Sequence, residues 1–154
     1  MVKVKLEDVI EQIEFASESS KSFLNLNTGE IHVIPEEVEI YAEEDIEDED
    51  FIPDWEKEII PVAKDIQKNP DNYIRFPDQY DIHEYSIMES FSLSLSDEKL
   101  RDILYYSLKG SGAFRRFKEN INRLGITEEW YKYKDEALRK IAVEWCQDNN
   151  LEYY

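Results

Sequence analysis

An acidic run in the first half of the chain is the feature that most limits how this protein can fold. Residues 36–50 read EEVEIYAEEDIEDED, with ten acids in fifteen positions and no base. Carboxylates are seldom buried without a partner, so most of this run must face water in any fold. Because few apolar side chains are available to anchor it, we expect a loop or a poorly anchored helix, mobile over about residues 36–54.

The net charge is distributed as unevenly as this run suggests. Residues 1–97 hold 26 acids and 7 bases, a net charge of −19. Residues 98–154 hold 10 acids and 11 bases, a net charge of +1, which brings the whole chain to −18. Such a field repels nucleic acid and anionic lipid over most of the surface and favours a basic partner. We therefore expect a basic protein as partner, no membrane role, and nucleic acid only through the C-terminal third. The oligomeric state does not follow from these features.

Length and composition predict one folded domain over residues 1–154. The chain is 42% hydrophobic and 13% aromatic, which suits a buried core and argues against general disorder. Cys146 has no second cysteine to pair with, the first residues do not resemble a signal peptide, and no apolar run reaches the roughly 20 residues that span a bilayer. We expect a cytoplasmic protein.

Apolar spacing predicts an α+β fold, with an N-terminal helix and a β-hairpin forming a small antiparallel sheet, packed with a mainly helical C-terminal half. The helix spans about residues 5–18, and the hairpin turns near Gly29, which supplies the positive φ of a tight turn. A second helix follows Pro53, with Trp55 and Ile60 on its apolar stripe. Residues 72–77 fit a short strand, and the final LEYY fits an edge strand beside the hairpin.

Helical spacing continues from Asp81 almost to the end of the chain. Asp97, with Ser96, is expected to cap one of these helices, Gly110 to end it, and Thr127 to cap the last. The last helix carries Trp130 and Trp145 on an apolar stripe.

The stretch GSGAFRRFK at 110–118 has two interpretations. In the first it is a helix junction, in which Ser111 caps the second helix while Phe114 and Phe117 are buried. In the second it is an anion or partner site formed by the following residues: Ser111, Gly112, Arg115, Arg116 and Lys118. The spacing matches no common nucleotide-binding motif. We also predict that Arg115 or Arg116 pairs with a carboxylate from the acidic N-terminal segment.

The remaining candidate chemistry is sparse. The acidic patch is formed by Glu43, Glu44, Asp45, Glu47, Asp48, Glu49 and Asp50. Counted from Asp45 it resembles a calcium loop loosely, because Asp50 stands where the turn needs glycine, so a solvated charge run is preferred. His32 and His83 lack neighbours at metal-ligand spacing, Cys146 fits an inert thiol, and no carboxylate pair lies in an apolar setting. We expect no catalytic residues, no metal and no cofactor, and favour a protein that is not an enzyme.

Four pieces of the chain resemble a bacterial uncharacterised protein family of the UPF type, whose pattern is GxGAFRRFK…WY…EWC. They are FLNLNTGEI at 23–31, GSGAFRRFK at 110–118, WYKYKDEA at 130–137 and AVEWCQDNN at 142–150. The resemblance implies a single cytoplasmic domain of unknown function. Our first hypothesis is a non-enzymatic, acidic interaction or regulatory module that binds a basic protein surface. The alternative is a phosphate-ligand or nucleic-acid-handling protein that uses the helix start at 110–118.

Overall fold

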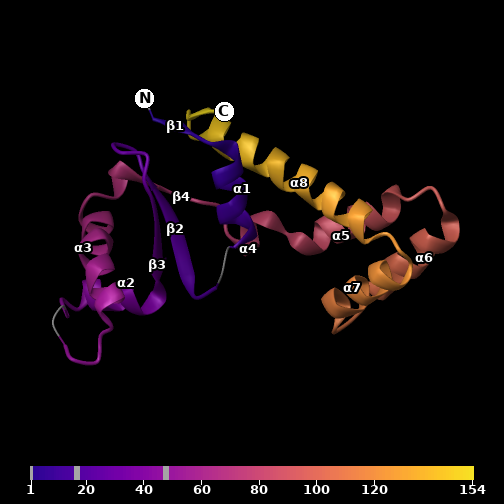
Figure 1. The fold of residues 1–154 in the computed structure, drawn as a ribbon, viewed down its shortest axis with the longest axis horizontal. Helices are drawn as coiled ribbons and strands as arrows, with labels where there is room; N and C mark the ends of the chain where they lie inside the picture. Colours follow the sequence, from indigo (N-terminus) through magenta and orange to yellow (C-terminus); the bar gives the residue numbers. More distant parts are fainter. Residues whose placement is uncertain (1, 16–17, 47–48) are drawn as a thin grey trace. The chain divides into compact units, whose positions relative to one another are not determined.

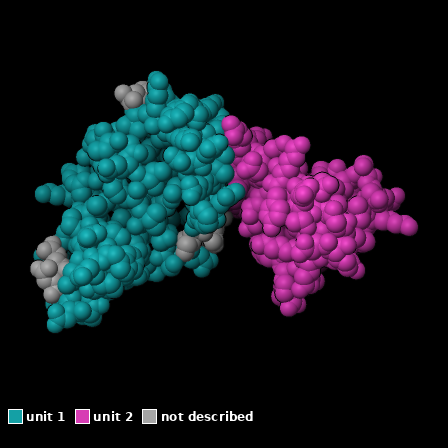
Figure 2. All heavy atoms as spheres, viewed as in Figure 1, with its two compact units in different colours: residues 1–81, 142–154 teal, residues 82–141 magenta. Residues whose placement is uncertain are grey.

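The computed structural model describes residues 2–15, 18–46 and 49–154, and their contacts group the chain into two compact units. Unit 1 comprises residues 1–81 and 142–154, and unit 2 comprises residues 82–141 (Figure 2). The single domain expected from the chain length stays a prediction.

Unit 1 contains a three-stranded antiparallel sheet. Strand β2 (Ser20–Asn25) lies between β3 (Ile31–Pro35) and β4 (Tyr73–Arg75) (Figure 1). In the turn between β2 and β3, the Oδ1 atom of Asn25 accepts hydrogen bonds from the amides of Asn27 and Thr28 at 2.8 and 3.2 Å, and Gly29 has a φ of 79°. Both the hairpin and the third strand lie where the sequence predicted them.

Helices accompany this sheet in unit 1. They are α1 (Leu6–Glu14), α2 (Glu36–Glu43) and α3 (Asp54–Lys68), followed by a 3-10 turn (Pro70–Asn72), while the short α4 (Gln79–Ile82) ends at the first residue of unit 2. Val38 and Ala42 of α2 and Ile60 and Ala63 of α3 form one buried cluster with Ile34 of β3. The acidic run therefore begins as an anchored helix, because two of its few apolar residues lie one turn apart and reach the same core.

The two ends of the chain form a separate pair of strands in unit 1. Strand β1 (Lys3–Val4) runs parallel to β5 (Glu152–Tyr153). The prediction that LEYY extends the hairpin sheet is wrong. Hydrogen bonds from the Leu6 amide to the Tyr154 carbonyl at 2.8 Å and from the Tyr154 amide to the Val4 carbonyl at 3.1 Å hold the chain ends together instead.

Unit 2 is helical and has an aromatic core. It contains α5 (Glu84–Ser94), α6 (Glu98–Ser107), α7 (Ala113–Arg123) and the first part of α8 (Thr127–Asp148). The Trp130 ring lies 5.4 Å from that of Phe91 and 4.9 Å from that of Phe117, in edge-to-face arrangements. Such contacts stabilise a core beyond the apolar area that they bury.

Some helix boundaries of unit 2 follow the local signals in the sequence, and others do not. Asp97 caps α6, since its Oδ1 accepts hydrogen bonds from the amides of Lys99 and Leu100 at 2.9 and 3.2 Å. Gly110 has the predicted left-handed conformation, with a φ of 76°. Thr127 is the first residue of α8 and donates its hydroxyl to the Ile121 carbonyl at 3.4 Å, so it does not cap the helix as predicted.

The predicted α+β class is confirmed, with a small antiparallel sheet and a mainly helical C-terminal half. Among the described residues, no helix is both long and apolar enough to cross a bilayer.

Candidate functional site

Most of the described acids of residues 36–50 lie on the solvent-facing side of α2 and of the loop that leads to α3. Val38 and Ala42 are buried, whereas Glu43 and Glu44 are exposed at the end of α2. The remaining described members of the acidic patch, Asp45, Glu49 and Asp50, are also exposed. Glu47 and Asp48 lie outside the described residues.

Asp45 differs from the other described members of the patch because it is paired with a cation. It adopts a left-handed conformation with a φ of 59°, and its Oδ1 lies 2.5 Å from Nζ of Lys64 on α3. The hydrogen bond from Lys64 and the charge of that lysine lower the pKa of the Asp45 carboxyl. The carboxylate at the first position of the loosely calcium-like loop is thus paired with a lysine. Within the described residues, no three His, Cys, Asp or Glu side chains gather as a metal site would require.

Two aromatic side chains stand exposed among these acids. Phe51 follows Asp50 and is 65% exposed, and Trp55 follows Asp54 at the start of α3 and is 55% exposed. The placement of Trp55 on the apolar stripe of this helix is wrong. Ile60 is buried on α3, and the residue one turn before it is Glu56, so Trp55 lies one step to the side of the buried face.

Glu56 makes a contact that sequence reasoning missed. Its side chain is only 5% exposed and forms a hydrogen bond with Glu37 of α2. Burial raises the pKa of the Glu56 carboxyl, and the hydrogen bond and negative charge of Glu37 raise it further. The expectation that no carboxylate pair lies in an apolar setting is therefore wrong. The two residues are nineteen positions apart in the sequence and on different helices, so no spacing rule would pair them.

Arg116 explains much of the positive charge in GSGAFRRFK. Its Nε donates to the Ser107 carbonyl at 3.1 Å, its Nη1 to the Ser111 carbonyl at 2.5 Å, and its Nη2 to the Lys109 carbonyl. These carbonyls belong to the last residue of α6 and the turn after it, where helices leave acceptors unpaired. The guanidinium group thus closes the junction between α6 and α7.

The other residues of this candidate site fall into two groups. Gly112, with a φ of 77°, is the N-cap of α7, and a Cβ there would approach Nη1 of Arg116 at 3.2 Å. Ser111 contributes its carbonyl, and its side chain does not cap α7 as the junction interpretation assumed. Arg115 and Lys118 are exposed, and Arg115 lies 3.8 Å from Glu119 of its own helix.

These contacts bear on two predictions about the stretch. Within unit 2, Arg115 meets an acid from its own helix and Arg116 meets carbonyl groups. A pairing of either arginine with an acid of the N-terminal segment, which belongs to unit 1, stays a prediction. Phe117 is fully buried as expected, but Phe114 is 47% exposed. The buried face of α7 runs through Ala113, Phe117 and Ile121, and this spacing of four leaves Phe114 outside it.

The pieces near the C-terminus also build cores. Trp145 donates its indole N–H to the Arg75 carbonyl at 3.1 Å and stacks on Phe76 with ring centres 4.7 Å apart, within unit 1. Cys146 beside it is fully buried, and burial raises the pKa of its thiol, which makes the thiolate scarcer. The contacts of Trp145 and Cys146 are those of residues that stabilise the fold.

Taken together, the described residues define a mainly helical α+β protein. The chain belongs to the Uncharacterised protein family (UPF0158), whose family model matches residues 3–154. It is similar to UPF0158 protein PA5073 of Pseudomonas aeruginosa, with 25% identity over 67 residues, which are 43% of this chain and 44% of the relative. No solved structure gives a significant match. The family is uncharacterised and assigns no activity.

Proposed function

We propose that this protein is a non-enzymatic interaction module that binds a basic protein surface through the acidic side of α2 and α3. The observation that carries this proposal is the exposure of Phe51 and Trp55 directly after Asp50 and Asp54. Aromatic residues supply a large share of the binding energy in protein interfaces, and Trp is among the most common hot-spot residues. A partner would cover both rings and place its bases against the neighbouring acids.

The charge of unit 1 supports the same partner class. Unit 1 holds 26 acids and 7 bases, a net charge of −19, whereas unit 2 holds 10 acids and 11 bases. Within the part of the chain that the structure describes, Asp45 is paired with Lys64, but Glu43, Glu44, Glu49 and Asp50 form no ion pair. Their combined field would steer a basic partner toward this surface and make binding sensitive to salt.

Affinity capture with matched variants tests the proposal. The immobilised protein is exposed to a lysate of its source organism at low and at high salt, and a retained basic protein is then purified and its Kd measured. The variant Trp55→Ala/Phe51→Ala should weaken binding at least tenfold, and Glu43→Gln/Glu44→Gln/Glu49→Gln/Asp50→Asn should lower the association rate and the salt dependence. Two control variants change exposed residues of unit 2. Tyr131→Ala/Leu93→Ala removes exposed apolar side chains, and Glu128→Gln/Glu129→Gln removes exposed acids, and neither should weaken binding.

Several results would count against this function. If the control pairs weaken binding as much as the test variants, the partner does not use the acidic side of α2 and α3. If only acidic or neutral proteins are retained, or if retention is unchanged by salt, the electrostatic argument fails.

The alternative function, a phosphate or nucleic-acid site at the start of α7, has less support. All three donor nitrogens of the Arg116 guanidinium group already bind carbonyl oxygens, which leaves Arg115 and Lys118 as cations for a ligand. A thermal-shift assay with inorganic phosphate, nucleotides and oligonucleotides distinguishes the two, since a ligand of the folded state raises the midpoint of unfolding.

A further inference from the structure

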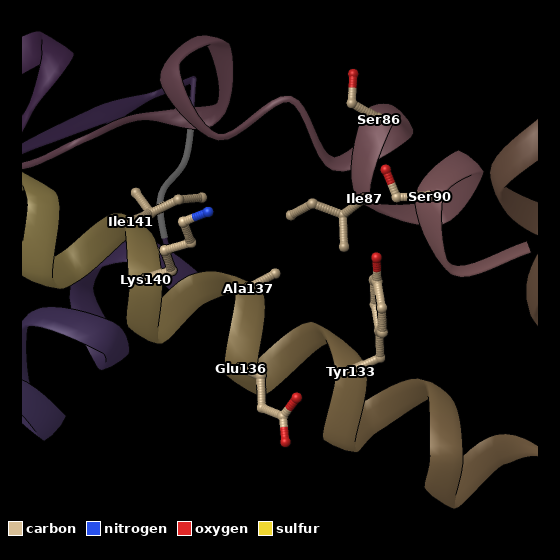
Figure 3. A pocket seen from close by; sticks show the side chains of 8 residues that line it. All are labelled: Ser86, Ile87, Ser90, Tyr133, Glu136, Ala137, Lys140 and Ile141. Carbon is tan, nitrogen blue, oxygen red and sulfur yellow. The ribbon is translucent and has the colours of Figure 1, made fainter. Parts of the chain in front are cut away.

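A groove in unit 2, between α5 and α8, has the size and lining of a small-ligand site. Its volume is about 410 Å³, within the range of roughly 300–1,000 Å³ that is common for such sites. Ser86, Ser90 and Ala137 are among the residues that line it, and the small Ala137 side chain on α8 leaves space opposite Ile87 of α5 (Figure 3). The Tyr133 ring bounds the groove and is held against Phe91, with ring centres 5.3 Å apart.

The floor of the groove is apolar and comes from both helices. Ile87 projects from α5, and Ala137 and Ile141 lie one turn apart on α8. Ile87 is buried, and the other two are partly buried. An aliphatic or aromatic group of a ligand would displace water from this floor, which is favourable in proportion to the apolar area covered.

The rim of the groove carries hydrogen-bond donors that have no partner among the described residues. On α5, the hydroxyls of Ser92 and Ser94 donate to carbonyls of their own helix at 2.9 and 2.6 Å. Within the described contacts, the hydroxyls of Ser86, Ser90 and Tyr133 make no such bond. Of these, the hydroxyls of Ser90 and Tyr133 are available to a ligand in the groove, whereas that of Ser86 points away from α8 (Figure 3).

The charges around the groove determine the sign of that ligand. The Lys140 side chain points toward the groove, whereas that of Glu136 points away from it (Figure 3). The nearby Lys134 is paired with Glu84 at 3.2 Å, but Lys140 has no ion pair within the described part of the chain. One ammonium group and two hydroxyls beside an apolar floor match a carboxylate that has an apolar body.

We infer that this groove binds a small amphipathic carboxylate. The carboxylate is held by the Lys140 ammonium group, and its apolar part lies on Ile87, Ala137 and Ile141. This site lies in unit 2 and is independent of the proposed protein-binding surface in unit 1.

Titration of the full chain with sodium octanoate, followed by ¹H–¹⁵N correlation spectra, tests this inference. We expect saturable shifts confined to residues 86–90 and 133–141. Lys140→Gln should weaken octanoate binding about tenfold, the loss expected for a charge-assisted hydrogen bond. Lys132→Gln, on the same helix but outside the groove, should leave the affinity unchanged. Octylammonium, with the same chain and the opposite charge, should not saturate the site.

Filling the floor provides a second, independent variant. Ala137→Leu should abolish the shifts, and the dispersion of its spectrum shows whether unit 2 remains folded. The inference is overturned if octanoate causes no saturable shifts in the unmodified chain, if the shifts map to unit 1, or if Lys140→Gln binds octanoate as well as Lys132→Gln does.

Discussion

The Nε atom of Arg116 donates a hydrogen bond to the Ser107 carbonyl oxygen at 3.1 Å, so a side chain of α7 closes the end of α6. The same guanidinium group binds two further carbonyls in the turn between the helices. The neighbouring Arg115 has only an exposed partner one turn along its own helix. Two adjacent arginines with the same charge therefore have different roles.

This difference predicts unequal effects of two alanine substitutions. Arg116→Ala leaves three carbonyls to water and should lower the free energy of unfolding by about 1–3 kcal/mol. Arg115→Ala removes only a surface ion pair and should change it by about 0.5 kcal/mol or less. Urea unfolding of both variants provides the measurement. Equal losses would show that the carbonyl contacts of Arg116 do not stabilise the junction.

Phe117 and Phe114 provide a second pair with unequal burial on one helix. Phe117 is fully buried against Phe91 and Trp130, so Phe117→Ala should cost about 3–5 kcal/mol of unfolding free energy. Phe114 is about half exposed, so Phe114→Ala should cost about 1 kcal/mol or less. Thermal unfolding followed by circular dichroism compares them. A larger loss for Phe114 would contradict the assigned inward face of α7.

Local features of this fold were predictable because neighbouring residues determine them. The Asp97 cap and the positive φ at Gly29 and Gly110 depend on a few adjacent positions, and each occurs where the sequence predicted it. The strand at Tyr73–Arg75 is another such element. Secondary-structure propensity and turn conformation depend on only a few consecutive residues, so they can be predicted from the sequence alone.

Features that depend on distant residues were missed. The placement of Trp55 depends on which side of α3 packs against α2, and α2 itself was left open between a loop and a helix. The pairing of β5 with β1 joins opposite ends of the chain. From the sequence alone, Arg116 was treated as a cation free to bind a ligand. Its actual acceptors are backbone carbonyl groups, and because every residue has one, no sequence pattern identifies them.

The hydrogen bond between Tyr73 and Asp65 predicts a paired change in two pKa values. The Tyr73 hydroxyl donates to Oδ2 of Asp65 at 2.5 Å, which lowers the pKa of Asp65 and raises the pKa of Tyr73 to about 12. Asp65 therefore stabilises the fold above its usual pKa of 3.8, and this contribution is lost as the pH falls through the lowered value. Tyr73 contributes below its usual pKa of 10, and that part is lost as the pH rises toward about 12.

Replacing the tyrosine tests both directions. In Tyr73→Phe, the pKa of Asp65 should rise toward its usual value, and the free energy of unfolding at neutral pH should fall only slightly, because the hydrogen bond is exposed to solvent. Carboxyl NMR titration follows Asp65, and absorbance in alkaline solution should lose a tyrosine that ionises at about pH 12. Tyr131→Phe, at an exposed tyrosine, is the control. An unchanged pKa of Asp65 would show that the hydrogen bond is not formed in solution.

The buried Glu56 predicts a stability that falls as the pH rises. Its folded-state pKa lies above the usual 4.5, so the folded state holds a proton that the unfolded chain releases, and stability declines from about pH 4.5 upward through the raised value. In Glu56→Gln, the side-chain amide N–H can donate a hydrogen bond to Glu37, and the folded state no longer has to bind a proton at this position. It should raise the free energy of unfolding at neutral pH by up to about 1 kcal/mol and flatten its dependence on pH. Glu58→Gln changes an exposed carboxylate on the same helix and should leave the slope in place. Urea unfolding between pH 4 and 8 separates the two variants, and a slope that persists in Glu56→Gln would mean that another group takes up the proton.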